Sequence, residues 1–133
     1  MKYLLDTNIC IFYLKGIYPK IRDKLLSKNP EDIKIPAMVK AELFYGAEKS
    51  RNRKENTEAV EKFLLPFEIL PFGDAEALVY GRIRAGLEAE GVPIGPNDLI
   101  IAAAALVADG ILVANNVKEF SRIPSLHIQD WTR

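Results

Sequence analysis

The sequence predicts an α/β fold in which a central parallel sheet is covered by helices on both faces. Short apolar segments that suit strands alternate with segments of helical periodicity, and this alternation favours parallel pairing. Hydrophobic residues make up 49% of the 133 residues and charged residues 27%, which is typical of a globular chain. We therefore expect residues 1–133 to form a single domain whose core needs no disulfide or structural metal.

The first half of the chain carries two expected strands and four expected helices. Lys2–Leu5 is the first strand, and the turn-prone Asp6-Thr7-Asn8 follows it at once. Ile33–Ile35 is the second, and Pro36 opens the next helix, a position where proline is tolerated. The helices are expected at Ile9–Lys15, which Gly16 ends, at Lys20–Ser27, from Pro36 to about Lys49, and at Glu55–Leu65, which Pro66 ends.

In the second half, two long helices lie between candidate strands. The first opens at Gly73-Asp74 and ends at Gly91, and the second is the apolar Asp98–Ala108, which follows Pro96-Asn97. The strands are the candidate Ile69–Leu70, the clear Ile111–Ala114 and the further candidate Leu126–Ile128. Polar residues that directly follow parallel strands converge on one crevice, and both Asp6 and Asn115-Asn116 hold that position.

Net charge does not identify a function class for this chain, but hydropathy and cysteine content indicate where in the cell we expect it. The net charge is zero, but residues 1–66 carry 13 basic and 9 acidic side chains and residues 67–133 carry 5 and 9, so local basic clusters exist. The densest is Lys49–Lys54, expected mainly to be a solvated helix end. The longest apolar run, Leu99–Ala108, is about half of what a bilayer requires, and the single Cys10 fits a reducing compartment. A soluble, cytoplasmic protein without membrane contact is expected.

Three carboxylates occupy positions where carboxylates are costly. Asp6 directly follows a buried-looking strand, and Asp98 opens a helix of apolar residues. Glu42 falls on the inward arc that Met38, Val39, Leu43, Tyr45 and Gly46 define on its helix. Structural roles remain open for each. Asp6 would start a turn, Glu42 would lie at the core rim or pair with Lys49, and Asp98 would complement the helix dipole with Asn97 as the cap.

Together these acids suit a hard metal ion. Carboxylates cannot crowd in apolar surroundings without raised pKa values or a bound cation. Because the only histidine, His127, lies near the C-terminus and Cys10 has no partner thiol, Mg²⁺ or Mn²⁺ is favoured over zinc or copper. Such ions activate water for attack on a phosphodiester. A phosphohydrolase or phospho-acceptor domain is disfavoured, because Thr7 and Asn8 stand where it would place a second acid.

Four strings, in order and over nearly the whole chain, resemble the PIN-domain ribonuclease toxins of the VapC family. They are LLDTN at residues 4–8, AELFYGA at 41–47, GVPIGPNDLIIAA at 91–103, and VANNVKEF at 113–120 followed by RIP at 122–124 and DW at 130–131. The resemblance implies a three-layer PIN-like fold and a Mg²⁺-dependent endoribonuclease whose substrate is expected to be a structured RNA such as a tRNA. It also implies a cognate VapB-type antitoxin that inhibits the toxin, and a homodimer.

The resemblance also assigns roles by position. Asp6 and Asp98 match the direct metal ligands, Glu42 the third acid, and the Asn116–Glu119 stretch the fourth polar corner. Many relatives have aspartate where this chain has Asn116, so whether Asn116 or Glu119 completes the site, and whether a second ion binds, stays open. By its local sequence alone, Glu119 would be a solvated loop acid. Ala114 and Ser125 also depart from the pattern, which commonly has threonine and glycine there.

A catalytically silent PIN module that only binds RNA or protein is the alternative to an enzyme. The presence of all the acids argues against it. Trp131 is expected to pack over the sheet edge rather than to stack on RNA.

Overall fold

A five-stranded, all-parallel sheet forms the centre of the protein in the computed structural model, which describes residues 1–133. The strand order is β3-β2-β1-β4-β5, and the α/β fold class is therefore confirmed. Both strand candidates are confirmed to within one residue. The strands are β1 (Tyr3–Leu5), β2 (Ile33–Pro36), β3 (Glu68–Leu70), β4 (Ile111–Val113) and β5 (His127–Gln129).

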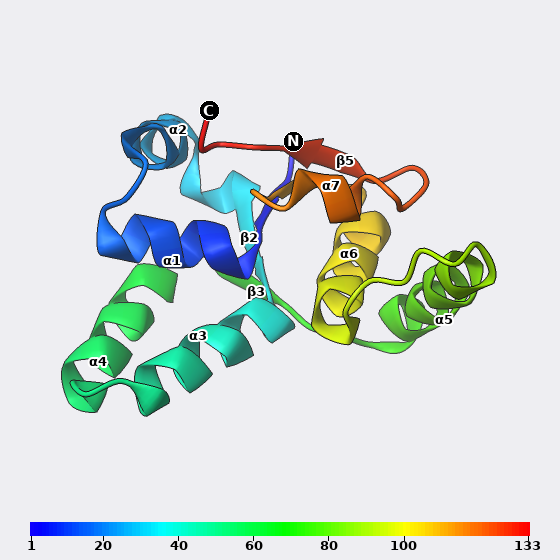
Figure 1. Cartoon of the computed structure of the whole chain (residues 1–133). Helices are drawn as coiled ribbons and strands as arrows, with labels where there is room; N and C mark the ends of the chain where they lie inside the picture. The colour runs from blue at the N-terminus through cyan, green and yellow to red at the C-terminus, as the bar shows by residue number, and fades with distance from the viewer.

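Helices flank the sheet on both sides, with α1, α2 and α4 on one side of the strands and α5 and α6 on the other (Figure 1). None of them is long and apolar enough to cross a membrane. A 3-10 turn also spans Pro30–Asp32. The helices are α1 (Thr7–Lys15), α2 (Pro19–Ser27), α3 (Ala37–Lys49), α4 (Arg53–Leu64), α5 (Asp74–Ala89), α6 (Pro96–Ala108) and α7 (Val117–Phe120).

Helices α1, α4 and α6 each start two residues before the expected residue, and α7 was not expected at all. Helix α1 begins at Thr7 with no intervening turn, because Asp6 itself adopts the extended conformation of an N-cap residue. Helix α6 begins at Pro96 with Gly95 as its cap, so Asn97 lies in the first turn and is not the cap. Helix α7 was expected to be a polar connection. Its four residues are too few for a helical period to show in the sequence.

The chain order places a crevice beside β1. From β1 the chain builds β2 and β3 on one side and then returns to add β4 and β5 on the other. The buried residues Leu4 and Leu5 pair with Leu112 and Val113, and the Asp6 amide donates to the Val113 carbonyl at 2.9 Å. In such sheets the point where the strand order reverses opens at the carboxyl ends of the strands. Asp6 therefore lies at the opening between β1 and β4.

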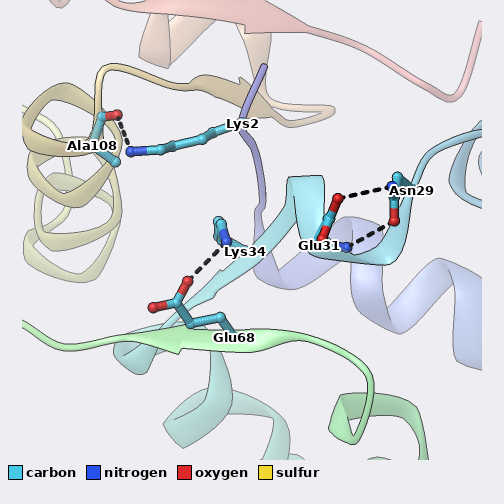
Figure 2. A network of polar contacts seen from close by, with 6 residues as sticks. All are labelled: Lys2, Asn29, Glu31, Lys34, Glu68 and Ala108. Atoms are coloured by element: carbon cyan, nitrogen blue, oxygen red, sulfur yellow. Dashed lines mark hydrogen bonds and ion pairs between the residues drawn. The ribbon is translucent and has the colours of Figure 1, made fainter.

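Toward the amino ends of the strands, polar groups find local partners (Figure 2). The Lys34 ammonium on β2 lies 2.8 Å from the Glu68 carboxylate on β3, and the two residues are paired in register. The hydrogen bond and charge of Lys34 lower the pKa of Glu68. The Lys2 ammonium donates to the Ala108 carbonyl at the end of α6 at 3.3 Å. The contacts at this end of the sheet are structural.

Ser125 stands in the left-handed region of backbone conformation, with φ of 66°. A side chain there costs roughly 1–2 kcal/mol, which explains why glycine is common at this position in the related pattern. We expect Ser125→Gly to raise the free energy of unfolding by about 0.5–1 kcal/mol, because the gain exceeds the entropy lost by glycine. Denaturant melts would measure this. Ser121→Gly is the matched control and should destabilise, since Ser121 has φ of −68°. A loss of stability in Ser125→Gly would contradict the strain.

Candidate active site

Four carboxylates from four separate segments approach one another at the carboxyl edge of the sheet. Asp6 follows β1 and is only 4% exposed. Glu42 lies in α3, Asp98 is the third residue of α6, and Glu119 lies in α7; all three are half-buried. Asp6 lies within the electrostatic reach of Asp98 and Glu42, and Asp98 within that of Glu42 and Glu119. The structure thus brings together Asp6, Glu42 and Asp98, and it also brings in Glu119, one of the two candidates for the fourth corner.

Burial and mutual repulsion disfavour the charged forms of two of these acids. Desolvation raises the pKa of Asp6 to about 7, the charges of Asp98 and Glu42 add to this, and the Thr7 backbone N–H partly opposes it. Desolvation also raises the pKa of Asp98, helped by the charges of Glu119 and Glu42. Although Asp6 precedes α1, its side chain makes no capping hydrogen bond. Its carboxylate is therefore not explained by the turn-starting role.

Glu42 is held by two side chains whose part in the site the sequence did not indicate. The Thr7 hydroxyl donates to one Glu42 oxygen at 2.6 Å, and the Asn97 amide donates to the other at 3.3 Å. These bonds join the starts of α1 and α6 to α3. Only the opening of α6 at Pro96 turns Asn97 toward Glu42. The signal available in the sequence was that Thr7 and Asn97 are each adjacent to a candidate ligand.

Two details of the expectation for α3 are wrong. The buried stripe is Val39, Leu43 and Ala47, whereas Tyr45 is 64% exposed and Gly46 is also exposed. The expected inward face of α3 therefore included residues that face solvent, and Glu42 lies at the border of the core. Glu42 also does not pair with Lys49, whose ammonium lies over the Tyr45 ring.

At the fourth corner, the two candidates Asn116 and Glu119 have different surroundings. Glu119 lies on helix α7, not in a solvated loop, and its charge acts on Asp98. Asn116 precedes α7 and lines a neighbouring polar hollow of about 510 Å³ at the ends of β4 and β5. The Arg122 guanidinium donates to the Pro93 carbonyl at 3.2 Å. This bond ties the segment after α7 to the loop that leads to Asp98.

The donor set fits a hard divalent cation. None of the four acids forms an ion pair with a basic side chain, although four ion pairs exist elsewhere in the chain. All the available ligand atoms are oxygens. No three acidic, imidazole or thiol groups are already close enough to hold a metal ion between them. This arrangement suits Mg²⁺, which usually binds through one or two carboxylates and keeps several of its waters.

Comparison with known proteins agrees with this geometry. The family model described as PIN domain matches residues 3–126. Over its full length the chain is 40% identical to a protein of Rickettsia felis named ribonuclease VapC2, and it covers all of that protein. The chain belongs to the PIN domain family, among the VapC ribonucleases. The resemblance seen in the four sequence strings is confirmed.

Other VapC proteins are similar to this chain in sequence and structure along almost its whole length. A protein of Salmonella typhimurium named tRNA(fMet)-specific endonuclease VapC is 40% identical over 98% of both chains. A solved structure of DNA-bound VapBC from the same organism matches with a TM-score of 0.93, 40% identity and 98% coverage of both chains. The three-layer PIN fold is therefore confirmed. In this VapC chain Trp131 is 1% exposed and packs on Tyr3, so the expectation that it packs against the sheet is confirmed.

A groove in this VapC chain leads away from Glu42. It is a hollow of about 390 Å³ between α1, α3 and α4, with Glu42 among its lining residues. A second hollow of about 520 Å³ continues it between α1, α2 and α4, and the two share Leu14 and Ala59. The apolar faces expected on α1 and α4 therefore line two adjacent hollows. Their apolar lining includes Ile11, Leu14, Leu43, Val60, Phe63 and Phe67.

The raised pKa of Asp6 has a consequence for stability. In metal-free buffer, the free energy of unfolding should fall by a few kcal/mol as the pH rises from about 4 to about 7, at about 1.4 kcal/mol per unit of pKa difference. The folded chain binds more protons than the unfolded chain in this window, so the stabilisation is complete below the unfolded pKa and lost above the folded one. Chemical denaturation across this pH range would measure it. Asp6→Asn should flatten the curve, and an unchanged slope would contradict the assignment.

Proposed function

We propose that this chain is a Mg²⁺-dependent endoribonuclease that works in the cytoplasm, as one domain over residues 1–133, and is the toxin of a toxin–antitoxin pair. The observation that carries the proposal is the group of carboxylates at the carboxyl edge of the sheet, of which none has a basic partner. A bound cation would offset the charges of such a group, and a divalent ion with oxygen ligands serves phosphodiester hydrolysis. Mn²⁺ should be able to replace Mg²⁺.

In this proposal each acid has its own part. Asp6 and Asp98 would hold the ion directly, and such an ion would supply an activated water and offset charge on the phosphate. Thr7 and Asn97 donate to the two oxygens of Glu42 and fix its orientation, so Glu42 would be placed to orient a water of the ion. We propose Glu119 as the fourth acid, because its charge reaches Asp98. Asn116 lies beside the site and would contact the RNA strand rather than the ion.

The substrate we propose is a structured RNA such as a tRNA. Support comes from relatives named tRNA(fMet)-specific endonuclease, which are 40% and 38% identical over almost their whole length. Asp6, Glu42, Asp98 and Glu119, which we call the acid corner, would act on an unpaired stretch of such an RNA, because proteins reach unstacked nucleotides in loops more readily than those in duplexes.

The partner we propose is a VapB-type antitoxin whose helix lies in the groove between α1, α3 and α4. The groove offers an apolar path and opens at Glu42, so an amphipathic helix would place apolar side chains along it. An arginine from that helix would meet the acid corner, where its planar fork matches carboxylates. Support comes from the similarity to a solved VapBC assembly. We also propose a homodimer, as the family resemblance implies. Leu78 on α5, which is 56% exposed, would lie in the contact between the two copies.

Growth on induced expression tests the toxin assignment. Wild type should arrest growth, because unregulated RNA cleavage stops translation, whereas Asp6→Ala should grow normally. Co-expression of the adjacent open reading frame should restore growth, and the two chains should purify together. Equal toxicity of wild type and Asp6→Ala would contradict the proposal. A wild type that is harmless and inactive on RNA would indicate a silent PIN module.

A further inference from the structure

Tyr45 is the most exposed aromatic side chain in the chain, and it lies beside the acid corner. It is 64% exposed, while Tyr18 and Phe72 are 41% and 38% exposed. In α3, Tyr45 comes three residues after Glu42, so it lies one turn further along the helix, on nearly the same face. Neither of the apolar hollows beside the site includes it. A large aromatic ring is therefore presented to solvent next to the proposed cleavage point.

Positive charge continues the same face of α3. The Lys49 ammonium lies 5.2 Å from the centre of the Tyr45 ring, and Lys49 follows Glu42 by seven residues, which is two helical turns. Beyond it, at the turn between α3 and α4, an entirely polar hollow of about 540 Å³ is lined by Arg51, Arg53 and Lys54 and also by Glu55 and Glu58. Arg53 is paired with Glu48, so the unpaired positive charge next to the Tyr45 ring is that of Lys49.

We propose that the stripe formed by Tyr45 and Lys49 binds the single-stranded part of the RNA substrate, with a base stacked on Tyr45 and a neighbouring phosphate on Lys49. The inference rests on the proposed ribonuclease function and extends it to the nucleotides beside the cut. Base stacking on an exposed ring is sequence-tolerant, and lysine attracts phosphates without reading bases. The stripe therefore holds the strand across the acid corner without selecting its sequence. Tyr45 is a substrate-binding residue, and it takes no part in the hydrolysis itself.

The test measures binding of fluorescein-labelled tRNA(fMet) to the full chain made inactive by Asp98→Asn. Adding Tyr45→Leu should raise Kd roughly five- to 100-fold, because leucine keeps the apolar area and loses the flat ring. Tyr45→Trp should stay within about twofold of the parent. Lys49→Gln should weaken binding and lower the salt dependence by about one unit of slope. Tyr18→Leu, an exposed aromatic beyond the far end of α1, is the matched control and should bind normally.

Kinetics and mass then separate the possible outcomes. In the otherwise wild-type chain, Tyr45→Leu should raise KM for the RNA and leave kcat nearly unchanged. Its mass in solution by light scattering should equal that of wild type. The proposal is overturned if Tyr45→Leu binds like the parent, if Tyr45→Trp is as weak as leucine, or if the mass changes, since Tyr45 would then be a subunit contact. If wild type neither binds nor cleaves RNA, the proposed function fails as well.

Discussion

Asp98→Asn is expected to lower the rate of RNA cleavage by at least about 100-fold while leaving the metal-free chain as stable as wild type or more stable. The first effect follows because the proposal makes Asp98 a direct ligand of the ion, and a lost electrostatic contact to the transition state costs on this order. The second follows because desolvation and the charges of Glu119 and Glu42 raise the pKa of Asp98, so its ionised form is less favourable in the folded chain than in the unfolded chain. A cleavage assay and a thermal melt in EDTA measure the two effects.

Asp74 supplies the matched control. It also lies in the first turn of a helix, α5, but it is exposed and lies outside the acid corner. Asp74→Asn should keep full activity and lose at most about 0.3–1 kcal/mol, the usual value of an acid at a helix start. If Asp98→Asn melted well below both wild type and Asp74→Asn, then Asp98 would be serving its helix rather than a metal ion.

Chelation is expected to abolish cleavage completely. Because carboxylates without basic partners cannot offset the charge of a phosphate, EDTA should remove all measurable activity, and Mg²⁺ or Mn²⁺ should restore it. KCl at matched ionic strength should restore nothing, which separates coordination of an ion from general screening of the acids. Undiminished cleavage in EDTA would rule out a metal mechanism and leave the acid corner without its proposed role.

The sequence predicted the sheet and three acids because both depend on short-range signals. Strands that alternate with helices define the parallel sheet, and Asp6 was visible as an acid at the end of a buried strand. Asp98 was visible because an apolar helix follows it. The strings around these residues, and around Glu42, then indicated the family. Whether these residues bind metal stays a prediction.

The parts of the site that the sequence missed depend on angles and on tertiary contacts. The direction of Asn97 follows from the start of α6 two residues before Asp98, and such boundaries are the least certain part of sequence reasoning. Glu119 was a candidate by the family resemblance, but its local sequence alone indicated a solvated loop acid, and only the fold places its charge where it acts on Asp98. The outward position of Tyr45 depends on the rotation of α3 about its axis. Polar and apolar residues are mixed along α3, so its sequence did not determine which face is buried.

The central claim is that Asp6 and Asp98 hold a divalent ion, and titration of the metal-stripped chain with Mn²⁺ tests it most directly. The electron paramagnetic resonance signal of free Mn²⁺ disappears as the ion binds, so binding is measured without RNA. Wild type should bind saturably, Asp6→Asn and Asp98→Asn should each weaken binding by at least about tenfold, and Glu68→Gln, which removes a paired acid far from the site, should bind like wild type. Equal binding by wild type and by the double variant Asp6→Asn with Asp98→Asn would contradict the account.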